Sequence, residues 1–484
     1  MTVVKYRPAA PRRTLTPAIA AAALALVVAG VVWGAFAFGA VYPWAYWPLA
    51  ACALAVGVVG VSLPRCAGAA SLTGLRLIGG AFVVFLIAAA VQIVPLPLAQ
   101  LAKLSPEASS ALSRLDLGFA GGASDRHALS IAPARTWTAL ALFASFAFLV
   151  VGSARLLSIR GARRTAEAIA IVGVSLAFAA IAQMPFATGK VYGVWTPIDG
   201  GTPYGPFVNR NHFAGWMLMG LPLTFGLLCA MLSRAMRGVR PYWRDRLMWL
   251  STPDASLILL TGAATIVMAI SLVLTLSLSG MTALAAAIAI TAVCVIRRRW
   301  TRGRTAAAIA YLALLFLVAY GWAGSDVIAS RFGENDWHEL DARRGAWTDA
   351  LDVSARFPLT GTGLNTYGVA TILYQRHDLE HHYEQAHNDY LQLMAEGGVL
   401  LAVPAALCLA VFALTVRRRF RDETSTTAYW LRVGAVTGLA AIALQETFDF
   451  SLQMPGNALL FAVLCGIALH VAPPKAEVPR RPQV

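Results

Sequence analysis

Charged residues are scarce in this chain. They make up 13% of its 484 residues, whereas hydrophobic residues make up 58% and the mean hydropathy is +0.65. Soluble globular proteins carry about 25% charged residues, so the composition excludes an ordinary soluble protein. It predicts instead a protein that lies within a lipid bilayer.

Cysteine is also scarce, and its positions exclude disulfide bridges in the outer loops. All six cysteines fall within predicted membrane helices or on their predicted cytoplasmic side. Disulfides form in oxidising compartments outside the cytoplasm, so these residues predict neither an outer disulfide nor a cysteine-ligated metal. They are Cys52, Cys66, Cys229, Cys294, Cys408 and Cys465.

Long apolar runs dominate the sequence. Crossing the bilayer takes roughly 20 apolar residues in a helix, and about twelve such runs occur. The first run lacks a small-residue cleavage site, so we expect a retained helix rather than a signal peptide. The predicted spans are 17–38, 43–63, 75–94, 136–154, 165–185, 212–232, 255–277, 280–296, 305–324, 396–416, 431–447 and 455–472.

The placement of the basic residues predicts the orientation. Of the 39 Lys and Arg residues, 28 fall on one side of the membrane if the N-terminus is cytoplasmic. Cytoplasmic loops carry this excess, so both termini are predicted to be cytoplasmic. The basic runs at 297–304 and 417–421 follow predicted helices, where contact with anionic lipid explains the net charge of +15 without nucleic acid.

This orientation predicts three long outer segments. Two of them are 95–135 and 186–211. In the first, Leu98, Leu101 and Leu104 have the spacing of a short helix that lies along the membrane interface. The favoured alternative is that this helix is a structural cover. The predicted divisions are a cytoplasmic tail at 1–16, transmembrane helices at 17–324, a large outer loop at 325–395, transmembrane helices at 396–472 and a second cytoplasmic tail at 473–484.

The large outer loop is where chemistry is most expected, because polar groups beside a membrane core are costly unless paired, solvated or used. It contains five of the eight histidines. Helical spacing from Arg343 through Trp347 predicts a helix, which Pro358 and the glycines after it end in a turn. Arg343 and Arg344 are either solvated at the membrane surface or meet an anion, for which guanidinium groups provide bidentate hydrogen bonds.

His387 stands at a predicted helix start. Asn388 can cap the backbone amides of a helix that begins near Asp389, and that N-terminus favours a nearby negative charge. A histidine that titrates near neutral pH at this position is placed for proton transfer. The alternative is a purely structural histidine.

Two further polar groups stand at outer helix ends. Arg210, Asn211 and His212 begin the sixth span after an irregular Pro- and Gly-rich approach. Glu446 and Asp449 stand at the outer end of the eleventh span, and we expect both carboxylates to be solvated at the helix end.

A metal site is a weaker hypothesis. His377 and His381 are four residues apart, so one helical face would offer two imidazoles to a metal. No HExxH motif accompanies them, and a solvated amphipathic surface is the commoner explanation for such a mixture of residues. The sequence therefore predicts no metal ligands.

Several pieces of the chain carry a resemblance to a known family. They are GPFVNRNHFAG at 205–215, R-x-x-x-W from Arg343 to Trp347, FPLTGTGLNTYG at 357–368 and AHNDYLQLMAEGG at 386–398. In these pieces the chain resembles the O-antigen ligase and polymerase family of bacterial membrane glycosyltransferases. The resemblance implies an all-α polytopic membrane protein with about 12 transmembrane helices and a large helical periplasmic loop, similar to the GT-C class.

The resemblance also implies roles for individual residues. His387 would be the catalytic base or would orient the acceptor, Arg343 would hold the pyrophosphate of the donor, and Arg210 would be a second phosphate-binding arginine. The residues expected to contact substrate are Arg344, Asn388, Asn211, Tyr367 and His382.

The activity implied is metal-independent, inverting glycan transfer without a cofactor. The donor would be a saccharide on undecaprenyl pyrophosphate, and the acceptor a hydroxyl group of lipid A-core, of another repeat unit or of a protein. The enzyme would accordingly be a ligase, an O-antigen or exopolysaccharide polymerase, or a protein O-oligosaccharyltransferase. It would lie in the bacterial inner membrane among membrane lipids, with a periplasmic active site and no nucleic-acid partner.

Two other classes remain open from the sequence. A polysaccharide transporter or flippase would explain the many helices and Glu446, but it predicts internal repeats and broken helices near the midplane, which the sequence does not display. A purely structural membrane protein would leave the charged outer loop unexplained.

Overall fold

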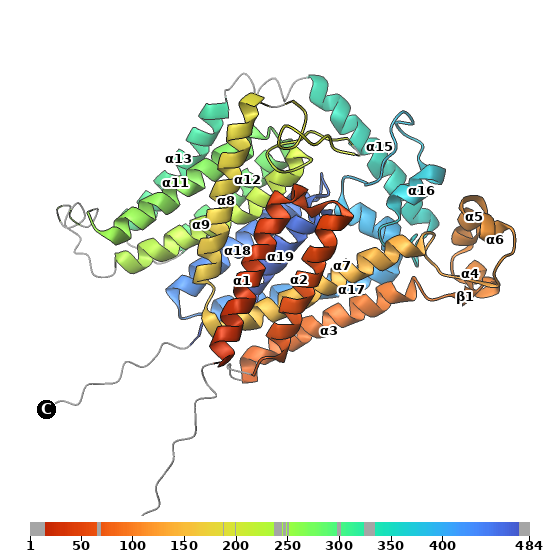
Figure 1. Ribbon diagram of the computed structural model, residues 1–484, viewed down its shortest axis with the longest axis horizontal. Coiled ribbons are helices and arrows are strands. Elements are labelled where there is room, and N and C mark those ends of the chain that lie inside the picture. The colour runs from red at the N-terminus through yellow and green to blue at the C-terminus, as the bar shows by residue number, and fades with distance from the viewer. Residues whose placement is uncertain are drawn as a thin grey trace, which may run out of the picture.

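The computed structural model describes residues 15–64, 69–186, 188–198, 200–236, 244, 248, 251–297, 302–323 and 334–473. Cys66, most of both predicted tails and the beginning of the large outer loop lie outside these residues. The described chain is almost entirely helical, as the sequence predicts (Figure 1).

Each predicted apolar run coincides with one helix. Ten described helices are long and apolar enough to cross a membrane, and α19 is a shorter apolar helix. The protein is therefore a multi-pass, all-α membrane protein. Helix α13 (Arg302–Ala323) also coincides with a run and completes the set of twelve. The other helices are α1 (Leu15–Phe36), α2 (Pro43–Ser62), α3 (Ala69–Val91), α7 (Pro133–Arg160), α8 (Arg163–Gln183), α9 (Arg210–Ala235), α11 (Pro253–Leu274), α12 (Leu278–Arg297), α17 (Asp389–Arg421), α18 (Thr426–Gln445) and α19 (Pro455–Leu469).

The segments between these helices contain one further long helix, α15, and several short elements. The two strands form one antiparallel pair, in which Leu96 lies opposite His127. The elements are η1 (Phe38–Ala40), β1 (Leu96–Pro97), α4 (Leu98–Leu104), α5 (Pro106–Leu115), α6 (Leu117–Ala120), β2 (Arg126–His127), η2 (Met184–Phe186), α15 (Glu334–Arg356), α16 (Tyr367–Tyr374) and η3 (Ser451–Gln453).

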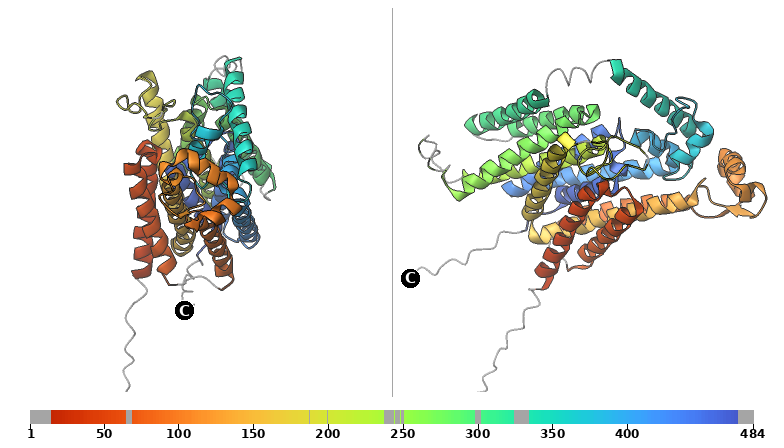
Figure 2. Two further views of the ribbon diagram at one scale, coloured as in Figure 1. Left: turned by 90° about the vertical axis from the view of Figure 1, so that its right-hand side faces the viewer. Right: turned by 45° about the horizontal axis from the view of Figure 1, so that its top comes forward.

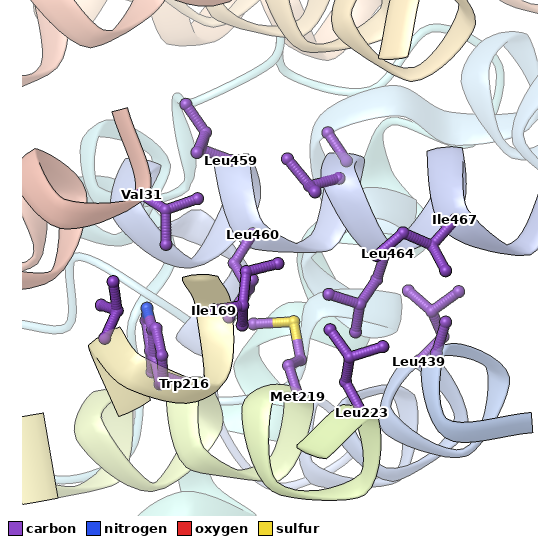
Figure 3. Packing of buried hydrophobic residues seen from close by; sticks show 14 of the residues in the cluster. Val31, Ile169, Trp216, Met219, Leu223, Leu439, Leu459, Leu460, Leu464 and Ile467 are labelled. Carbon is purple, nitrogen blue, oxygen red and sulfur yellow. The ribbon is translucent and has the colours of Figure 1, made fainter. Parts of the chain in front are cut away.

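Helix α9 lies at the centre of the membrane region. Every residue from 211 to 230 is buried, as expected for a helix that is apolar on all sides. Figure 3 shows Trp216 and Met219 of α9 close to Leu460 of α19. These contacts fix the position of α9, and so of the polar residues at its N-terminus.

Small residues let the membrane helices approach closely. A Cβ atom added to Gly152 of α7 would lie 2.6 Å from the backbone of Gly57 in α2, and one added to Gly226 of α9 would lie 3.1 Å from Gly434 in α18. Backbone contacts of this kind are the usual way in which helices associate in lipid. They make the membrane region a rigid support for the outer segments.

The outer segments pack against one another at one end of the molecule. Figures 1 and 2 show α4, α5 and α6 beside α16 and the end of α15. Leu101 and Leu112 share a buried cluster with Val353, and Arg356 pairs with Glu107 at 2.9 Å. The short helix predicted from the leucine spacing is therefore confirmed as α4, and it supports the large outer loop.

Helix α17 is interrupted where it meets the glycine turn after α15. Gly398 adopts φ 52° and ψ −155°, which is not helical. The freed backbone pairs with the turn instead: the Val399 amide donates to the Pro358 carbonyl at 2.9 Å, and the Thr362 amide donates to the Ala395 carbonyl at 3.0 Å. The turn and the first part of α17 thus form one unit.

Candidate functional site

Arg343 lies on α15 and reaches the end of α18. The helical spacing that predicted this helix is confirmed, since α15 runs from Glu334 to Arg356. One guanidinium nitrogen, Nη1, donates to the carbonyl oxygen of Phe448 at 2.9 Å. The positive charge of Arg343 also acts on the nearby imidazole of His387. The two residues expected to do chemistry are therefore neighbours.

His387 directly precedes α17, as the sequence predicts. The Asn388 side chain caps the helix by accepting hydrogen bonds from the amides of Tyr390 and Leu391, at 3.1 Å and 3.0 Å. The same side chain donates to the Thr447 carbonyl at 3.0 Å. The Asn388 side chain therefore joins the start of α17 to the end of α18, and His387 lies at this junction.

The His387 ring is enclosed by aromatic rings. Its centroid lies 4.8 Å from that of Phe450, edge on, and 6.2 Å from that of Tyr383. The residue is partly exposed, yet its Nδ1 atom is buried and has no hydrogen-bond partner among the described residues. A buried polar atom without a partner is uncommon, and it is compatible with a group that meets a ligand.

Burial lowers the pKa of His387 to about 3, and the Arg343 guanidinium acts in the same direction. The expectation that this histidine titrates near neutral pH is therefore wrong. Its ring is surrounded by aromatic side chains and a cation, and both disfavour the protonated form. The imidazole is neutral at physiological pH and can accept a proton.

The N-terminus of α9 comes to the same place. Asn209 caps this helix by accepting from the Asn211 amide at 2.9 Å, and Arg210 is its first residue and is partly exposed. The carbonyl of Asn211, which is buried, accepts from Gln445 at 3.0 Å. His212 lies edge on against Phe450, with ring centroids 4.8 Å apart. Phe450 therefore lies between the imidazoles of His212 and His387.

The carboxyl groups after α18 are buried rather than solvated. Glu446 is 1% exposed and Asp449 is 0% exposed, so the expected solvation at the helix end is wrong. Asp449 lies 3.9 Å from Nε2 of His212. Burial first and the nearby Asp389 second raise the pKa of Glu446 well above its ordinary value. A raised pKa favours the neutral form of this carboxyl group.

The site combines features that bind anions. Two helix N-termini, those of α9 and α17, lie beside the end of α18, and each presents the positive end of a helix dipole. Arg343 adds a permanent charge in a geometry suited to phosphate oxygens. Together with a neutral imidazole, the arrangement can hold an anion and accept a proton.

Three other residues named from the sequence lie around this centre in different settings. Arg344 is exposed on α15. Tyr367 is 1% exposed, and its hydroxyl donates to the Ala346 carbonyl at 3.0 Å, so it supports α15 from within. His382 pairs with Glu384 at 3.7 Å at the surface of the outer loop. The structure thus joins Tyr367 to the site through a helix rather than by direct contact.

His377 and His381 do not share a helical face, because α16 ends at Tyr374 and the chain beyond it is irregular. His377 pairs with Asp349 at 2.8 Å, whereas His381 pairs with Asp378 at 3.1 Å. Within the described part of the chain, no group of three or more His, Cys, Asp or Glu residues has the arrangement of a metal site.

Sequence reasoning missed the residues that connect the site. Phe450 carries no charge and belongs to no chemical motif, so only its position in space reveals its contact with both imidazoles. Gln392 and Gln453, whose side chains hydrogen-bond to each other, also belong to no motif that the sequence reveals.

A known protein family matches part of the chain. Residues 263–405 match the family model described as O-antigen ligase. The matched range contains Arg343 and His387, whereas Arg210 precedes it. Among curated proteins, none matches the chain. The match confirms the resemblance seen in the sequence and supports a membrane glycan ligase or polymerase type of function.

Proposed function

We propose that the protein is a membrane glycosyltransferase that moves a glycan from undecaprenyl pyrophosphate to a hydroxyl acceptor at the periplasmic face of the bacterial inner membrane. The observation that carries this proposal is the placement of Arg343 and His387 at the end of α18, where the guanidinium donates to the Phe448 carbonyl and the imidazole lies against the Phe450 ring. The match to the O-antigen ligase family over these residues supports it.

The chemistry follows from the two groups. The acceptor oxygen attacks the anomeric carbon of the donor sugar, and the bond from that carbon to the pyrophosphate oxygen breaks. The bonding electrons leave with the pyrophosphate, whose growing negative charge Arg343 and Arg210 stabilise. The hydroxyl proton passes to His387. Because attack comes from the face opposite the leaving group, the anomeric configuration inverts.

Donor binding would also strengthen the base. In the free protein, Arg343 helps to lower the pKa of His387. A pyrophosphate bound to Arg343 offsets that charge, so the pKa of His387 rises. The imidazole is then a better proton acceptor when the donor is in place than when the site is empty.

Arginine replaces the metal ion in this proposal. Guanidinium groups carry a permanent charge and need no metal to stabilise a diphosphate. Transfer should therefore continue in EDTA, whereas loss of transfer that added divalent cation restores would contradict this part of the proposal. The remaining site residues, Arg344, Asn388, Asn211 and His382, are proposed to contact the sugars or the phosphates.

Three acceptors fit this proposal: lipid A-core, a further repeat unit and a protein hydroxyl. Each gives a different product in a strain that lacks the gene. Loss of long-chain lipopolysaccharide indicates ligation or polymerisation of O-antigen, loss of exopolysaccharide indicates its polymerisation, and loss of a glycoprotein indicates protein glycosylation. Gels of all three products from one deletion strain distinguish these outcomes.

Substitution of His387 by Ala tests the base directly. We expect glycan transfer to fall at least about a hundredfold, the usual contribution of a positioned base. Transfer is measured on gels in the deletion strain that carries each variant, at matched protein levels. His381→Ala is the control, because His381 is an exposed histidine of the same loop. Wild-type transfer by a well-expressed His387→Ala protein would remove the base from the proposal.

Substitution of Arg343 by Lys tests the phosphate contact. We expect little transfer, because a point charge does not reproduce the bidentate guanidinium contact. Arg114→Lys is the matched control, since Arg114 is exposed on α5. Equal turnover by the two Lys variants would argue against a pyrophosphate contact at Arg343.

A further inference from the structure

The backbone of His387 has a conformation that side chains rarely tolerate. Its φ is +51°, in the left-handed region, whereas the following Asn388 is extended with φ −163°. A residue other than glycine persists in this region only where its surroundings hold it there. Two side chains, one on α17 and one on α15, bind the backbone at this point.

Gln392 is the first of these side chains. It is 5% exposed, and its Oε1 atom accepts a hydrogen bond from the amide of Ala386 at 3.0 Å. Its Nε2 atom donates to Oε1 of Glu396 at 3.1 Å and to Oε1 of Gln453 at 3.3 Å. These partners fix the direction of the amide, because a rotated side chain would point its NH₂ group at the Ala386 amide.

Glu396 in turn is fixed by the glycine turn. Its Oε2 atom accepts from the Asn365 amide at 2.8 Å, and its Oε1 atom accepts from the Tyr367 amide at 3.0 Å. The hydrogen bonds therefore form a continuous path from the turn, through Glu396 and Gln392, to the residue before His387.

Trp347 is the second side chain. Its indole Nε1 donates to the His387 carbonyl at 3.2 Å. Trp347 lies one helical turn after Arg343 on α15, and its ring centroid is 6.0 Å from that of Phe448, whose carbonyl Arg343 binds. The indole therefore connects the backbone of His387 with the helix that carries the cation.

We propose that Gln392 and Trp347 are positioning residues that hold His387 in its left-handed conformation, with its imidazole against Phe450 and at a fixed separation from Arg343. The expected effect of Gln392 and Trp347 on turnover rests on the proposed function. Their expected effect on the conformation of His387 is independent of it.

The test compares two substitutions in the same buried network. Gln392→Met removes the acceptor for the Ala386 amide, whereas Gln453→Met removes another member of the network and leaves that bond intact. Diethyl pyrocarbonate modifies neutral imidazoles, and mass spectrometry of the peptides measures its rate at His387 in the purified full-length protein at pH 7.5. His381, which is exposed, serves as the internal standard.

In Gln392→Met we expect modification of His387 to accelerate about tenfold, the population change that loss of one hydrogen bond to a buried partner produces. In Gln453→Met the rate should stay near that of the wild type. Equal acceleration in both variants would mean general loosening, and no acceleration in Gln392→Met would mean that Gln392 does not hold His387. Either result overturns the proposal.

Trp347→Phe provides a second variant if Gln392→Met does not fold. It removes the indole donor and retains an aromatic ring, so we expect a rise in the rate at His387 that is smaller than for Gln392→Met. An unchanged rate would overturn the role of Trp347.

Turnover separates this inference from the proposed function. If both hold, Gln392→Met lowers kcat about a hundredfold, as small misplacements of a reacting group do, and leaves KM for the polyprenyl-linked donor near its original value. Faster modification of His387 with unchanged kcat would keep the positioning role and reject His387 as the base. A rise in KM alone would indicate a loosened substrate site, which contradicts a specific effect on His387.

Discussion

At the scale of the residue, the environment of His387 decides its chemistry. The sequence placed this histidine correctly, because Asn388 is a strong capping residue directly before a long apolar run. The prediction that His387 titrates near neutral pH was wrong, because its pKa depends on Phe450 and Arg343, which come from other parts of the chain. The neighbouring residues in the sequence therefore predict the position of such a side chain. Its protonation depends on the residues that surround it in the folded protein.

The lowered pKa makes a prediction about pH. Between pH 7.5 and 5.0, His387 stays above its pKa of about 3 and remains neutral, so its rate of modification by diethyl pyrocarbonate should change little after correction for reagent hydrolysis. A histidine with the ordinary pKa of 6.5 loses its neutral form about thirtyfold over this range. His381, whose pKa is raised by its hydrogen bond to Asp378, should slow at least that much.

The two histidines are measured in one sample, so His381 is the control for reagent and pH. A parallel decline at both sites would show that His387 titrates as an ordinary histidine. It would also remove the proposed gain in basicity on donor binding, because that gain requires a pKa that starts low.

At the scale of the element, α17 and the glycine turn act as one piece. The sequence predicted the helix containing Arg343 from its periodicity and the turn from Pro358 and the glycines after it. It did not predict that α17 would open at Gly398 to pair with that turn, because such pairing depends on partners 30 to 40 residues away in the chain. Gln92, which directly follows α3, also belongs to this unit. Its side-chain amide donates hydrogen bonds to the Thr360 and Glu396 carbonyls at 2.8 Å each.

Gly361 is one of the positions where this unit leaves no room for a side chain. Its φ is +63°, and an added Cβ would collide with the backbone of Glu396. We expect Gly361→Ala to destabilise the protein by about 2 kcal/mol or more, from the combined strain and overpacking. The measurement is the apparent thermal midpoint of the detergent-solubilised protein by size-exclusion chromatography.

Gly79→Ala is the matched control, because an added Cβ at Gly79 of α3 meets no atom within 4 Å. Its thermal midpoint should equal that of the wild type or exceed it, since Ala favours helix more than Gly does. If both alanine variants had wild-type midpoints, the close contact between the turn and α17 would not exist in the folded protein.

At the scale of the whole molecule, the membrane region and the outer segments have separate tasks. The apolar runs predicted the spanning helices, because hydrocarbon imposes a simple length rule on every span. The packing of α4 and α5 beneath α15 and α16 had no sequence signal, because segments far apart in the chain meet there through ordinary apolar side chains. The same limit hid the burial of Glu446 and Asp449, whose neighbours come from α9 and α17.

The membrane region also explains why the site is so well ordered. Helix α9 is enclosed along residues 211–230, and α18 contacts it at Gly226 and Gly434. The N-terminus of α9 and the end of α18 are therefore fixed relative to each other before any substrate binds. Preorganised charge of this kind is the largest source of catalysis in many enzymes.

The most direct test of the central claim is a cryo-electron microscopy map of the full-length protein in lipid nanodiscs with undecaprenyl pyrophosphate. We expect the pyrophosphate beside the start of α17, within hydrogen-bonding distance of the Arg343 guanidinium, with His387 facing the position of the sugar carbon. A pyrophosphate bound elsewhere, with Arg343 and His387 making no contact with the donor, would contradict the account.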